Sequence, residues 1–244
     1  MTIPQRPTSD SIDSRWSIQI TDDGSATLVD RARGDSMHSG CGAIAETAHV
    51  YLQNSGVLVR LEQRQPTRIL EVGLGSGLGC LLTAAAANRH RAGVQYVALE
   101  NKLPPAEVVE QLGFERQGID RRWIAAYCQV IQRAAENAML RGPVGDHCQL
   151  IVYQCDAEAW SGRDEPAFDA IYFDPFSPET NPALWGQPVL AEMRRCLKPR
   201  ARLVSYCVNR RVRDTLAAVG FAVERVPGPP GGKREVLIAT AKVE

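Results

Sequence analysis

The chain has 244 residues and no formal net charge, with 44% hydrophobic and 23% charged residues. These proportions are those of an ordinary globular protein, and they exclude fibrous and extensively disordered chains. The longest apolar runs fall well short of the roughly 18 residues that span a bilayer, and the first residues lack the pattern of a secretory signal. We therefore expect a cytoplasmic protein without a membrane segment.

The cysteines give no sign of a metal site or of a disulfide framework. They are odd in number, widely scattered and form no Cys-x-x-Cys pair. We expect small buried side chains in a reducing compartment, and no bound metal.

The first part of the chain predicts an extension to a larger domain. Residues 1–15 are rich in Pro, Ser, Thr and Asp without periodicity, which predicts a disordered tail. Residues 16–29 alternate around the turn Asp22-Asp23-Gly24-Ser25, as in a β-hairpin, and apolar residues at helical spacing predict a helix over 42–53. This hairpin and helix form an N-terminal extension, residues 16–60, before a main domain over 61–244.

Apolar strand-like segments then alternate with helical stretches, which is typical of a doubly wound, Rossmann-like α/β sheet. A closing antiparallel hairpin is expected from residues 222–226 and 235–241, joined by a loop rich in Pro and Gly. The long spacer over 106–143 predicts extra helices above the sheet edge. The five strands are expected at 67–72, 95–99, 148–154, 168–173 and 202–207.

The first of these strands leads into a glycine-rich turn that predicts a nucleotide-like ligand. Gly73, Gly75 and Gly77 let the backbone approach a ligand, and the helix that follows presents free N–H groups. The spacing is G-x-G-x-G-x-G, which disfavours a dinucleotide, since the dinucleotide pattern is G-x-G-x-x-G. Glu100 ends the next strand, where an acid holds a ribose. With Glu71, these residues predict a site for S-adenosylmethionine.

Two further acids follow later strands. Asp156 is expected to accept a hydrogen bond from the adenine amino group or to cap a helix starting at Ala157. Asp174 precedes Pro175 and Phe176, and the prolines around this segment predict a rigid rim that holds a nucleophile in line. An alkylamine is mostly protonated near neutrality. We expect Asp174 to orient such an amine, with the Pro175 carbonyl as a second acceptor.

Basic residues are concentrated near the end of the chain. This region has few acids, and it either forms a face for nucleic-acid phosphates or a solvated arginine-rich surface. Its basic residues are Arg194, Arg195, Lys198, Arg200, Arg202, Arg210, Arg211, Arg213, Arg225, Lys233 and Arg234.

In order and spacing, several of these motifs resemble the methyltransferase half of MnmC-type tRNA modification enzymes. The resemblance covers roughly residues 30 to 240. It departs from the family at Gly79, where the family typically has Asn, and at Pro175, where it has Gly. The matching segments are His38-Ser39, Glu46-Thr47-Ala48-His49-Val50-Tyr51-Leu52, Glu71-Val72-Gly73-Leu74-Gly75-Ser76-Gly77-Leu78, Leu99-Glu100-Asn101-Lys102, Asp174-Pro175-Phe176-Ser177-Pro178, Asn181-Pro182, Leu197-Lys198-Pro199 and Gly232-Lys233-Arg234-Glu235.

The resemblance implies transfer of a methyl group from S-adenosylmethionine to the amine of 5-aminomethyl-(2-thio)uridine at the wobble position of the tRNA anticodon stem-loop. It implies catalytic roles for Asp174, Pro175 and Phe176, and cofactor-binding roles for Asn101 and Asp174. The FAD-dependent oxidase half is expected to be missing, so that another enzyme supplies the amine. Substrate or tRNA binding is implied for Glu46, Lys233, Arg234, Arg210 and Arg211.

Two other functions stay open at this point. The first is methyl or aminopropyl transfer to a different amine, which uses the same fold and a related cofactor. The second is a binding protein without catalysis, which is disfavoured because the glycine loop, Glu100 and Asp174 are all present.

Overall fold

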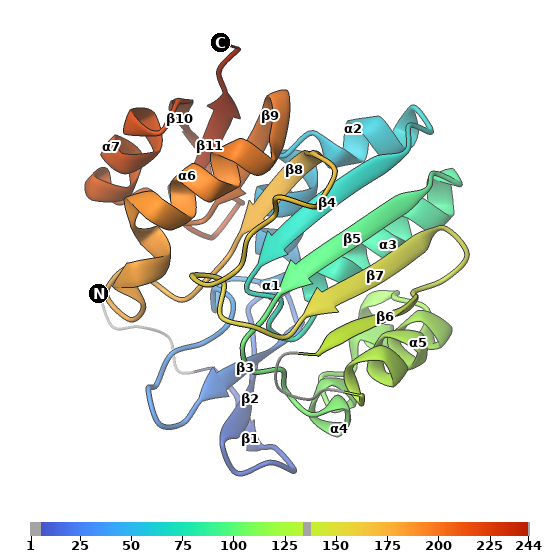
Figure 1. Cartoon of the computed structure of the whole chain (residues 1–244). Helices are drawn as coiled ribbons and strands as arrows, with labels where there is room; N and C mark the ends of the chain where they lie inside the picture. Colours follow the sequence, from blue (N-terminus) through green and yellow to red (C-terminus); the bar gives the residue numbers. More distant parts are fainter. Residues whose placement is uncertain (1–5, 134–137, 244) are drawn as a thin grey trace.

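The computed structural model describes residues 6–133 and 138–243. Its main body is an eight-stranded sheet in the order β10-β11-β9-β8-β4-β5-β7-β6 (Figure 1). The strands are β4 (Thr67–Val72), β5 (Val94–Leu99), β6 (Met139–Pro143), β7 (Cys148–Tyr153), β8 (Phe168–Phe173), β9 (Leu197–Ser205), β10 (Phe221–Pro227) and β11 (Glu235–Ala241).

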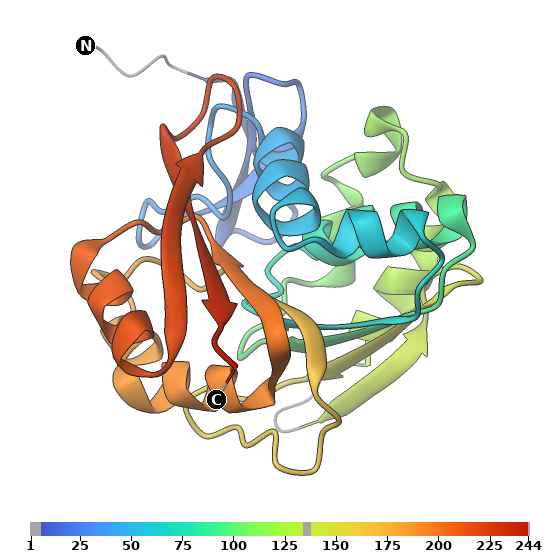
Figure 2. The ribbon, with the colours of Figure 1, turned by 90° about the horizontal axis from the view of Figure 1, so that it is seen from above.

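Helices cover both faces of this sheet, as expected for a doubly wound fold. Helices α2 and α3 pack on one face, and α6 and α7 pack on the other (Figures 1 and 2). The helical segments are α1 (Ala43–Thr47), the π-helical η1 (Ala48–Gln53), α2 (Val57–Glu62), α3 (Leu78–His90), α4 (Ala106–Glu110), η2 (Phe114–Gln117), α5 (Arg121–Ile131), η3 (Pro182–Trp185), α6 (Gln187–Cys196) and α7 (Arg210–Ala218). Within the described ranges, none of these helices is long and apolar enough to cross a membrane.

The central strands explain where a ligand can bind. Strands β8, β4, β5 and β7 pair in parallel, and their residues are mostly buried on both faces, which is why each reads as a continuous apolar run. Chain order runs outward from β4 in one direction through β5 and β7, and from β8 in the other through β9. The order therefore reverses between β4 and β8, and ligands in such sheets bind beyond the carboxyl ends of the strands at that point.

The predicted strands and the closing hairpin of the eight-stranded sheet are confirmed, and one strand of this sheet was missed. Strand β10 pairs antiparallel with β11, and β11 pairs antiparallel with β9. The spacer carries the expected helices, but it also contains β6, an edge strand paired antiparallel with β7. Its sequence escaped prediction because Arg, Gly and Pro interrupt the apolar pattern, which edge strands tolerate.

A second, three-stranded sheet precedes the main body. Strands β2 (Trp16–Ile20) and β3 (Ala26–Asp30) form the predicted hairpin, and β1 (Thr8–Asp10) pairs antiparallel with β2. The expected disordered tail is thus wrong for residues 6–15, while residues 1–5 lie outside the described part of the chain. A polar, exposed edge strand is held by backbone hydrogen bonds, so it shows no apolar pattern. The domain boundary at residue 60 stays a prediction.

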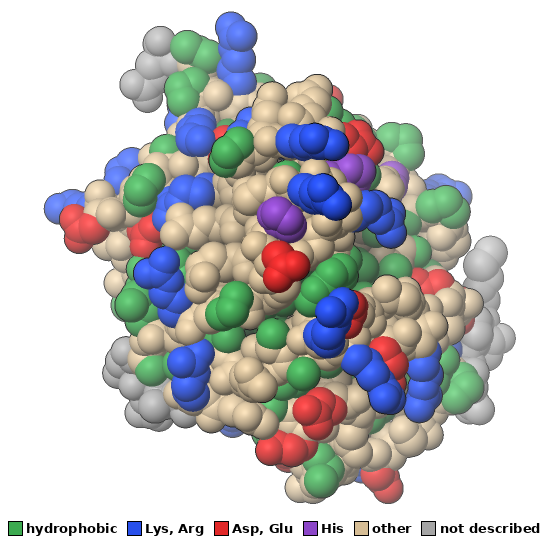
Figure 3. Space-filling view, turned by 90° about the vertical axis from the view of Figure 1, so that its right-hand side faces the viewer, with side chains coloured by type: hydrophobic (Ala, Val, Ile, Leu, Met, Phe, Trp, Pro, Cys, Tyr) green, Lys and Arg blue, Asp and Glu red, His purple; other side chains and the backbone are tan. Residues whose placement is uncertain are grey.

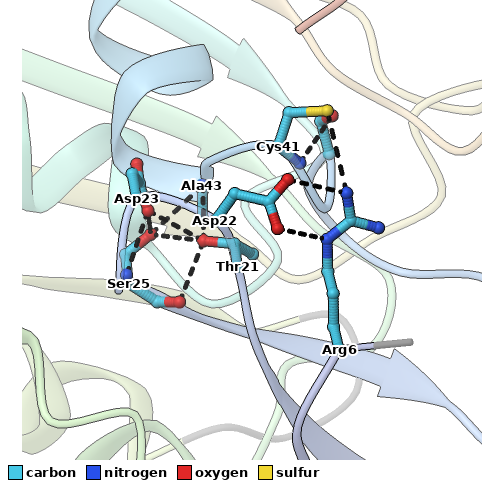
Figure 4. Close-up of polar contacts among 8 residues, drawn as sticks. Arg6, Thr21, Asp22, Asp23, Ser25, Cys41 and Ala43 are labelled. Atoms are coloured by element: carbon cyan, nitrogen blue, oxygen red, sulfur yellow. Dashed lines mark hydrogen bonds and ion pairs between the residues drawn. The ribbon is translucent and has the colours of Figure 1, made fainter. Parts of the chain in front are cut away.

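The hairpin turn of this small sheet also caps helix α1 (Figure 4). Ser25 Oγ accepts hydrogen bonds from the backbone N–H groups of Ala43 (3.1 Å) and Ile44 (3.2 Å), and Asp23 Oδ2 accepts one from Ala45 (3.0 Å). The first N–H groups of a helix have no partner within the helix, so these side chains satisfy them from outside. The turn Asp22-Asp23-Gly24-Ser25 therefore closes the hairpin and also holds the start of α1.

Candidate active site

A cavity of about 910 Å³ lies at the carboxyl ends of the central strands. The small N-terminal sheet lies at the end toward which β4, β5 and β7 point, and it contributes to the wall (Figure 1). All four of the predicted strand-end acids line this cavity, namely Glu71, Glu100, Asp156 and Asp174. The expected convergence of acids from separate strands is thus seen in the fold.

The glycine loop between β4 and α3 forms the floor beside these acids. Gly73 has φ +89°, and a Cβ there would come within 2.6 Å of the Asp174 carbonyl oxygen, so only glycine lets these two strand ends meet. Gly75 lines the cavity, and its N–H donates to Glu100 Oε2 at 3.0 Å. Gly77, with φ +80°, packs against the Tyr127 ring and is not among the lining residues.

Glu71 is buried beneath the loop without a full set of partners. Its Oε2 atom has no hydrogen-bond partner among the described residues. Burial, with a smaller contribution from the charge of Asp174, raises the pKa of Glu71 well above its ordinary value. A Cβ on Gly79 would lie 2.6 Å from Glu71 Oε1, so the glycine that departs from the family pattern leaves room for this carboxylate. An unsatisfied buried carboxylate beside a cavity is suited to a cationic ligand group.

Glu100, Asn101 and Asp156 also line the cavity. Glu100 accepts hydrogen bonds from the N–H groups of Gly75 and Lys102, and although these bonds lower its pKa, burial raises it overall. Asp156 Oδ1 accepts a hydrogen bond from Glu158 N at 3.0 Å. This closes a turn, and the helix that Asp156 was expected to cap is not formed.

Asp174 is held by a tyrosine that the sequence analysis did not select. The hydroxyl of Tyr51, a residue of η1, donates a short hydrogen bond to Asp174 Oδ1. Burial raises the pKa of Asp174 well above its ordinary value, and the hydrogen bond from Tyr51 opposes that rise. Tyr51 was overlooked because its helical spacing suggests a core residue, and most of its ring is indeed in the core.

The rim after Asp174 is fixed by two hydrogen bonds to carbonyl oxygens. Tyr206 donates to the Pro175 carbonyl at 2.9 Å, and the Trp185 indole N–H donates to the Phe176 carbonyl at 2.9 Å. Pro175 and Phe176 both line the cavity. The predicted rigid rim is present, but the Pro175 carbonyl, which was expected to face an amine, already accepts the Tyr206 hydroxyl.

Glu46 and Lys233 meet at the same end of the cavity. The Lys233 ammonium lies 4.0 Å from Glu46 Oε1 and 3.8 Å from the centroid of the Tyr206 ring. Glu46 Oε2 accepts a hydrogen bond from Ser39 N at 2.6 Å. Burial raises the pKa of Glu46, against the opposing charge of Lys233.

One further residue of the wall, His38, gave no sequence signal beyond its place in a matching segment. Its Nδ1 atom lies 2.9 Å from Thr27 Oγ1 in β3. Burial lowers the pKa of His38 to about 4, so its ring is neutral near pH 7. A lone histidine in the loop between β3 and α1 is therefore one of the residues whose cavity position only the fold reveals.

Many of the basic residues near the end of the chain, for which the sequence left a nucleic-acid face and a solvated surface open, contact other groups of the protein. Lys198 pairs with the buried Asp169 at 2.8 Å, and Arg225 pairs with Glu235 at 2.7 Å. Arg202 donates to the Asn54 carbonyl. Arg234, Arg210 and Arg211 are not among the cavity-lining residues. On the face drawn in Figure 3, basic side chains are likewise interspersed with acidic ones.

Instead, basic side chains of other segments stand at the cavity wall. Arg15 and Arg33 come from the N-terminal extension, and Lys102 follows β5. The Arg33 guanidinium lies over the Phe176 ring at 5.6 Å. Within the described residues, no group of three or more His, Cys, Asp or Glu side chains is arranged to hold a metal ion.

Comparisons with known proteins agree with this geometry. A family model described as S-adenosyl-L-methionine-dependent methyltransferase matches residues 120–242. A relative named tRNA 5-methylaminomethyl-2-thiouridine biosynthesis bifunctional protein MnmC, from Paracidovorax citrulli (strain AAC00-1), is 32% identical over 203 residues, covering 81% of this chain and 31% of the relative. A protein of the same name from Azoarcus sp. (strain BH72) is 31% identical over 230 residues, covering 91% of this chain and 35% of the relative. The chain thus spans about a third of the length of the curated relatives it matches.

Two solved structures share the fold. The crystal structure of MnmC2 from Aquifex aeolicus matches with a TM-score of 0.73 and 26% identity, covering 96% of this chain and 72% of that one. Spermidine synthase from Thermotoga maritima matches with a TM-score of 0.57 at 13% identity, covering 98% of this chain and 73% of that one. The second likeness concerns the fold alone.

Proposed function

Because this chain belongs to the family of S-adenosyl-L-methionine-dependent methyltransferases, we propose that it methylates the amine of 5-aminomethyl-(2-thio)uridine at the wobble position of tRNA. The names of its relatives support this substrate, since they concern 5-methylaminomethyl-2-thiouridine in tRNA. The observation that carries the proposal is Asp174, fixed by Tyr51 on the cavity wall within reach of the glycine loop. A carboxylate in that position is suited to an amine nucleophile.

The residues present fit S-adenosylmethionine. Glu100 and Asp156 both line the cavity; Glu100 would hold the ribose hydroxyls, and Asp156 would accept from the adenine amino group. Glu71, whose Oε2 lacks a partner among the described residues, would accept from the cofactor's ammonium group. Gly73 and Gly75 let the backbone approach the ligand, whereas Gly77 would shape the loop by packing on Tyr127. When bound, the cofactor supplies a methyl group on a positively charged sulfur.

Asp174 would prepare the amine for attack. A primary alkylamine has a pKa of about 10.4 and must lose a proton before its lone pair is free. An ordinary carboxylate is a poor acceptor for that proton because its pKa is far below that of the amine. Burial raises the pKa of Asp174 and so narrows the difference between the two pKa values. Asp174 then orients the amine and accepts its proton, while Tyr51 keeps the carboxylate in one position. Phe176 and the fixed Pro175 backbone form the rim that keeps the amine in line.

The charges around the cavity suit a nucleoside with a positively charged amine that belongs to a nucleic acid with an anionic phosphate backbone. The cavity contains the acids Glu46 and Asp174, whereas Arg33 and Lys102 stand where the N-terminal extension and the loop after β5 meet it. We infer that these two cations contact tRNA phosphates next to the modified nucleotide, with Arg210, Arg211 and Arg234 as outer contacts. The anticodon stem-loop is the part of tRNA that the proposed substrate requires.

The test is nucleoside analysis of tRNA rich in 5-aminomethyl-2-thiouridine after incubation with the protein and labelled S-adenosylmethionine. We expect a labelled methylaminomethyl nucleoside, found by liquid chromatography and mass spectrometry. Asp174→Asn should bind the cofactor nearly as tightly but transfer at least about 100-fold more slowly. The exposed Asp164→Asn serves as the matched control. Cofactor binding without transfer to this tRNA would reject the substrate and direct the search to other amines.

A further inference from the structure

The contacts of Lys233 identify a small cationic subsite in the cavity. Lys233 belongs to the loop between β10 and β11, and its ammonium lies over the Tyr206 ring and beside the Glu46 carboxylate, at 3.8 Å and 4.0 Å. The ring face and the carboxylate are the two groups that recognise an organic cation most directly. The structure therefore contains an alkylammonium group already bound at the substrate end.

The two walls of this subsite do not depend on the hairpin loop. The Tyr206 hydroxyl donates to the Pro175 carbonyl at 2.9 Å, which fixes the ring beside the Asp174 rim. Glu46 accepts a hydrogen bond from Ser39 N, and it lies on α1, whose start is capped by Ser25. Both walls are therefore held in place by other elements, and the ammonium is the part that a long, flexible side chain supplies.

The loop can release Lys233 without unfolding. Its ends are closed by backbone hydrogen bonds from Gly228 to the Arg234 carbonyl and from Gly232 to the Pro229 carbonyl, each 3.0 Å. His49 Nε2 also lies 2.9 Å from the Pro227 carbonyl, so the hairpin rests on η1. With the backbone so fixed, rotation of the Lys233 side chain, which is 42% exposed, is enough to empty the subsite.

We propose that Glu46 and Tyr206 form the binding site for the primary ammonium group of the substrate, and that Lys233 occupies this site until the substrate displaces it. This inference rests on the proposed function, because it assigns the substrate's aminomethyl group to the position that the lysine now fills. The incoming ammonium arrives protonated between Glu46 and Tyr206, next to Asp174. Lys233 thus acts as an internal competitor, because any cation that binds between Glu46 and Tyr206 must first displace it.

The test compares binding of n-butylammonium chloride, by titration calorimetry, to the wild type and to Lys233→Met. The variant keeps an unbranched, flexible side chain only one atom shorter than lysine and removes its charge. We expect affinity for n-butylammonium to rise at least tenfold, since an intramolecular competitor has a high effective concentration. Adding Glu46→Gln to this variant should lower the affinity tenfold or more. Lys242→Met, an exposed lysine on the segment after β11, is the matched control and should bind as the wild type does.

Equal affinity in the wild type and in Lys233→Met, or no binding in either, would overturn the proposal. So would weaker tRNA binding with a flatter salt dependence in Lys233→Met, because that result places Lys233 on a phosphate. Thermal unfolding of each variant checks that the fold is intact. The calorimetry requires no tRNA, so the two proposals fail separately. Tighter n-butylammonium binding without tRNA methylation would support the ammonium subsite and contradict the proposed nucleoside substrate. Methylation of tRNA without tighter n-butylammonium binding would support the substrate and contradict the subsite.

Discussion

Two acids at the ends of neighbouring parallel strands dominate the chemistry of the cavity. Glu71 is the next-to-last residue of β4, just before the glycine loop, and Asp174 directly follows β8. The last residues of the two strands, Val72 and Phe173, pair with each other. Burial raises the pKa of both carboxyl groups. Without a ligand, each of these carboxyl groups is therefore protonated more readily than a solvent-exposed one. A cation that enters the cavity favours the ionised carboxylate again.

Tyr51 tunes Asp174, which leads to a prediction about the pH profile. The hydrogen bond from Tyr51 lowers the pKa of Asp174, so Tyr51→Phe should raise that pKa further. The ionised carboxylate is the active form, and so the acid limb of kcat/KM should move to higher pH. We expect a loss of about tenfold at low pH that shrinks as the pH rises. A uniform loss across the pH range would show that Tyr51 only supports the fold.

Glu71 gives a second prediction, about proton release on cofactor binding. Its pKa is raised in the free protein, and a positively charged ligand should lower it. Binding therefore releases protons, and the affinity for S-adenosylmethionine should increase as the pH rises through the range between the two pKa values. Calorimetry in two buffers of different ionisation enthalpy measures this release. Glu71→Gln should reduce it, with Asp174→Asn measured in parallel, and an unchanged release in Glu71→Gln would contradict the assignment.

At the residue level, the sequence predicted acids well and aromatic partners poorly. Glu71, Glu100 and Asp174 each end an apolar run, so the strand pattern alone placed them at one edge. Tyr51 and Tyr206 come from a helix and from the end of a different strand, and their apolar rings hide the role of the hydroxyl groups. The fold brings Tyr51 to Asp174 by packing η1 beside β9 and the Tyr51 ring on Tyr172 of β8. Tyr206 reaches the rim from the residue after β9.

At the level of elements, helix α1 connects the N-terminal sheet to the chemistry. The hairpin turn caps its first N–H groups, and the helix with η1 carries Glu46 and Tyr51. Gly42 precedes α1, and a Cβ there would lie 2.6 Å from Asp23 Oδ2, so the glycine makes room for the cap. The small sheet thus acts as a support for the substrate end of the cavity.

Removal of the cap should therefore affect stability and activity together. Asp23→Ala loses the hydrogen bond to Ala45 N and should lower the free energy of unfolding by about 1 kcal/mol. Transfer should fall more than cofactor affinity does, because the glycine loop is untouched. Asp22→Ala breaks only an exposed pair with Arg6 and is the control. Urea unfolding measures the loss of stability, and separate assays measure cofactor affinity and methyl transfer. Equal effects of the two variants would contradict the role of Asp23 as a cap of α1.

The elements that the sequence missed are those held by backbone pairing. Strands β1 and β6 lie at sheet edges, where the partner strand supplies the hydrogen bonds and few apolar side chains are needed. The central strands were predictable because both of their faces are covered.

Across the whole molecule, the position of charge matters more than its sum. The sequence left open whether the basic residues of the last part of the chain form a nucleic-acid face or a solvated surface, and the fold pairs Lys198 with Asp169 and Arg225 with Glu235. Composition reveals an excess of cations but not which of them find partners across the sheet. Apart from Lys233, the Lys and Arg side chains that line the cavity are Arg15 and Arg33, near the N-terminal sheet, and Lys102, in the loop after β5.

This distribution predicts which surface binds tRNA. The pair Arg33→Ala and Lys102→Ala should weaken tRNA binding and reduce the slope of log affinity against log salt by roughly 0.7 for each phosphate that is no longer neutralised. Exposed Arg89 and Arg163, changed to Ala together, provide the control. Arg210→Ala with Arg211→Ala tests the outer contacts in the same assay. A slope that changes only in this last variant would move the interface to α7.

The cofactor end and the substrate end of the cavity also differ in the sequence separation of the residues that form them. The residues assigned to the cofactor other than Asp174 lie between Glu71 and Asp156, whereas the ammonium subsite joins Glu46 to Tyr206 and Lys233. During synthesis from the N-terminus, the parts of the cofactor end emerge from the ribosome well before the last wall of the subsite. The ability to recognise the amine is therefore the last part of the site to be completed as the protein is made.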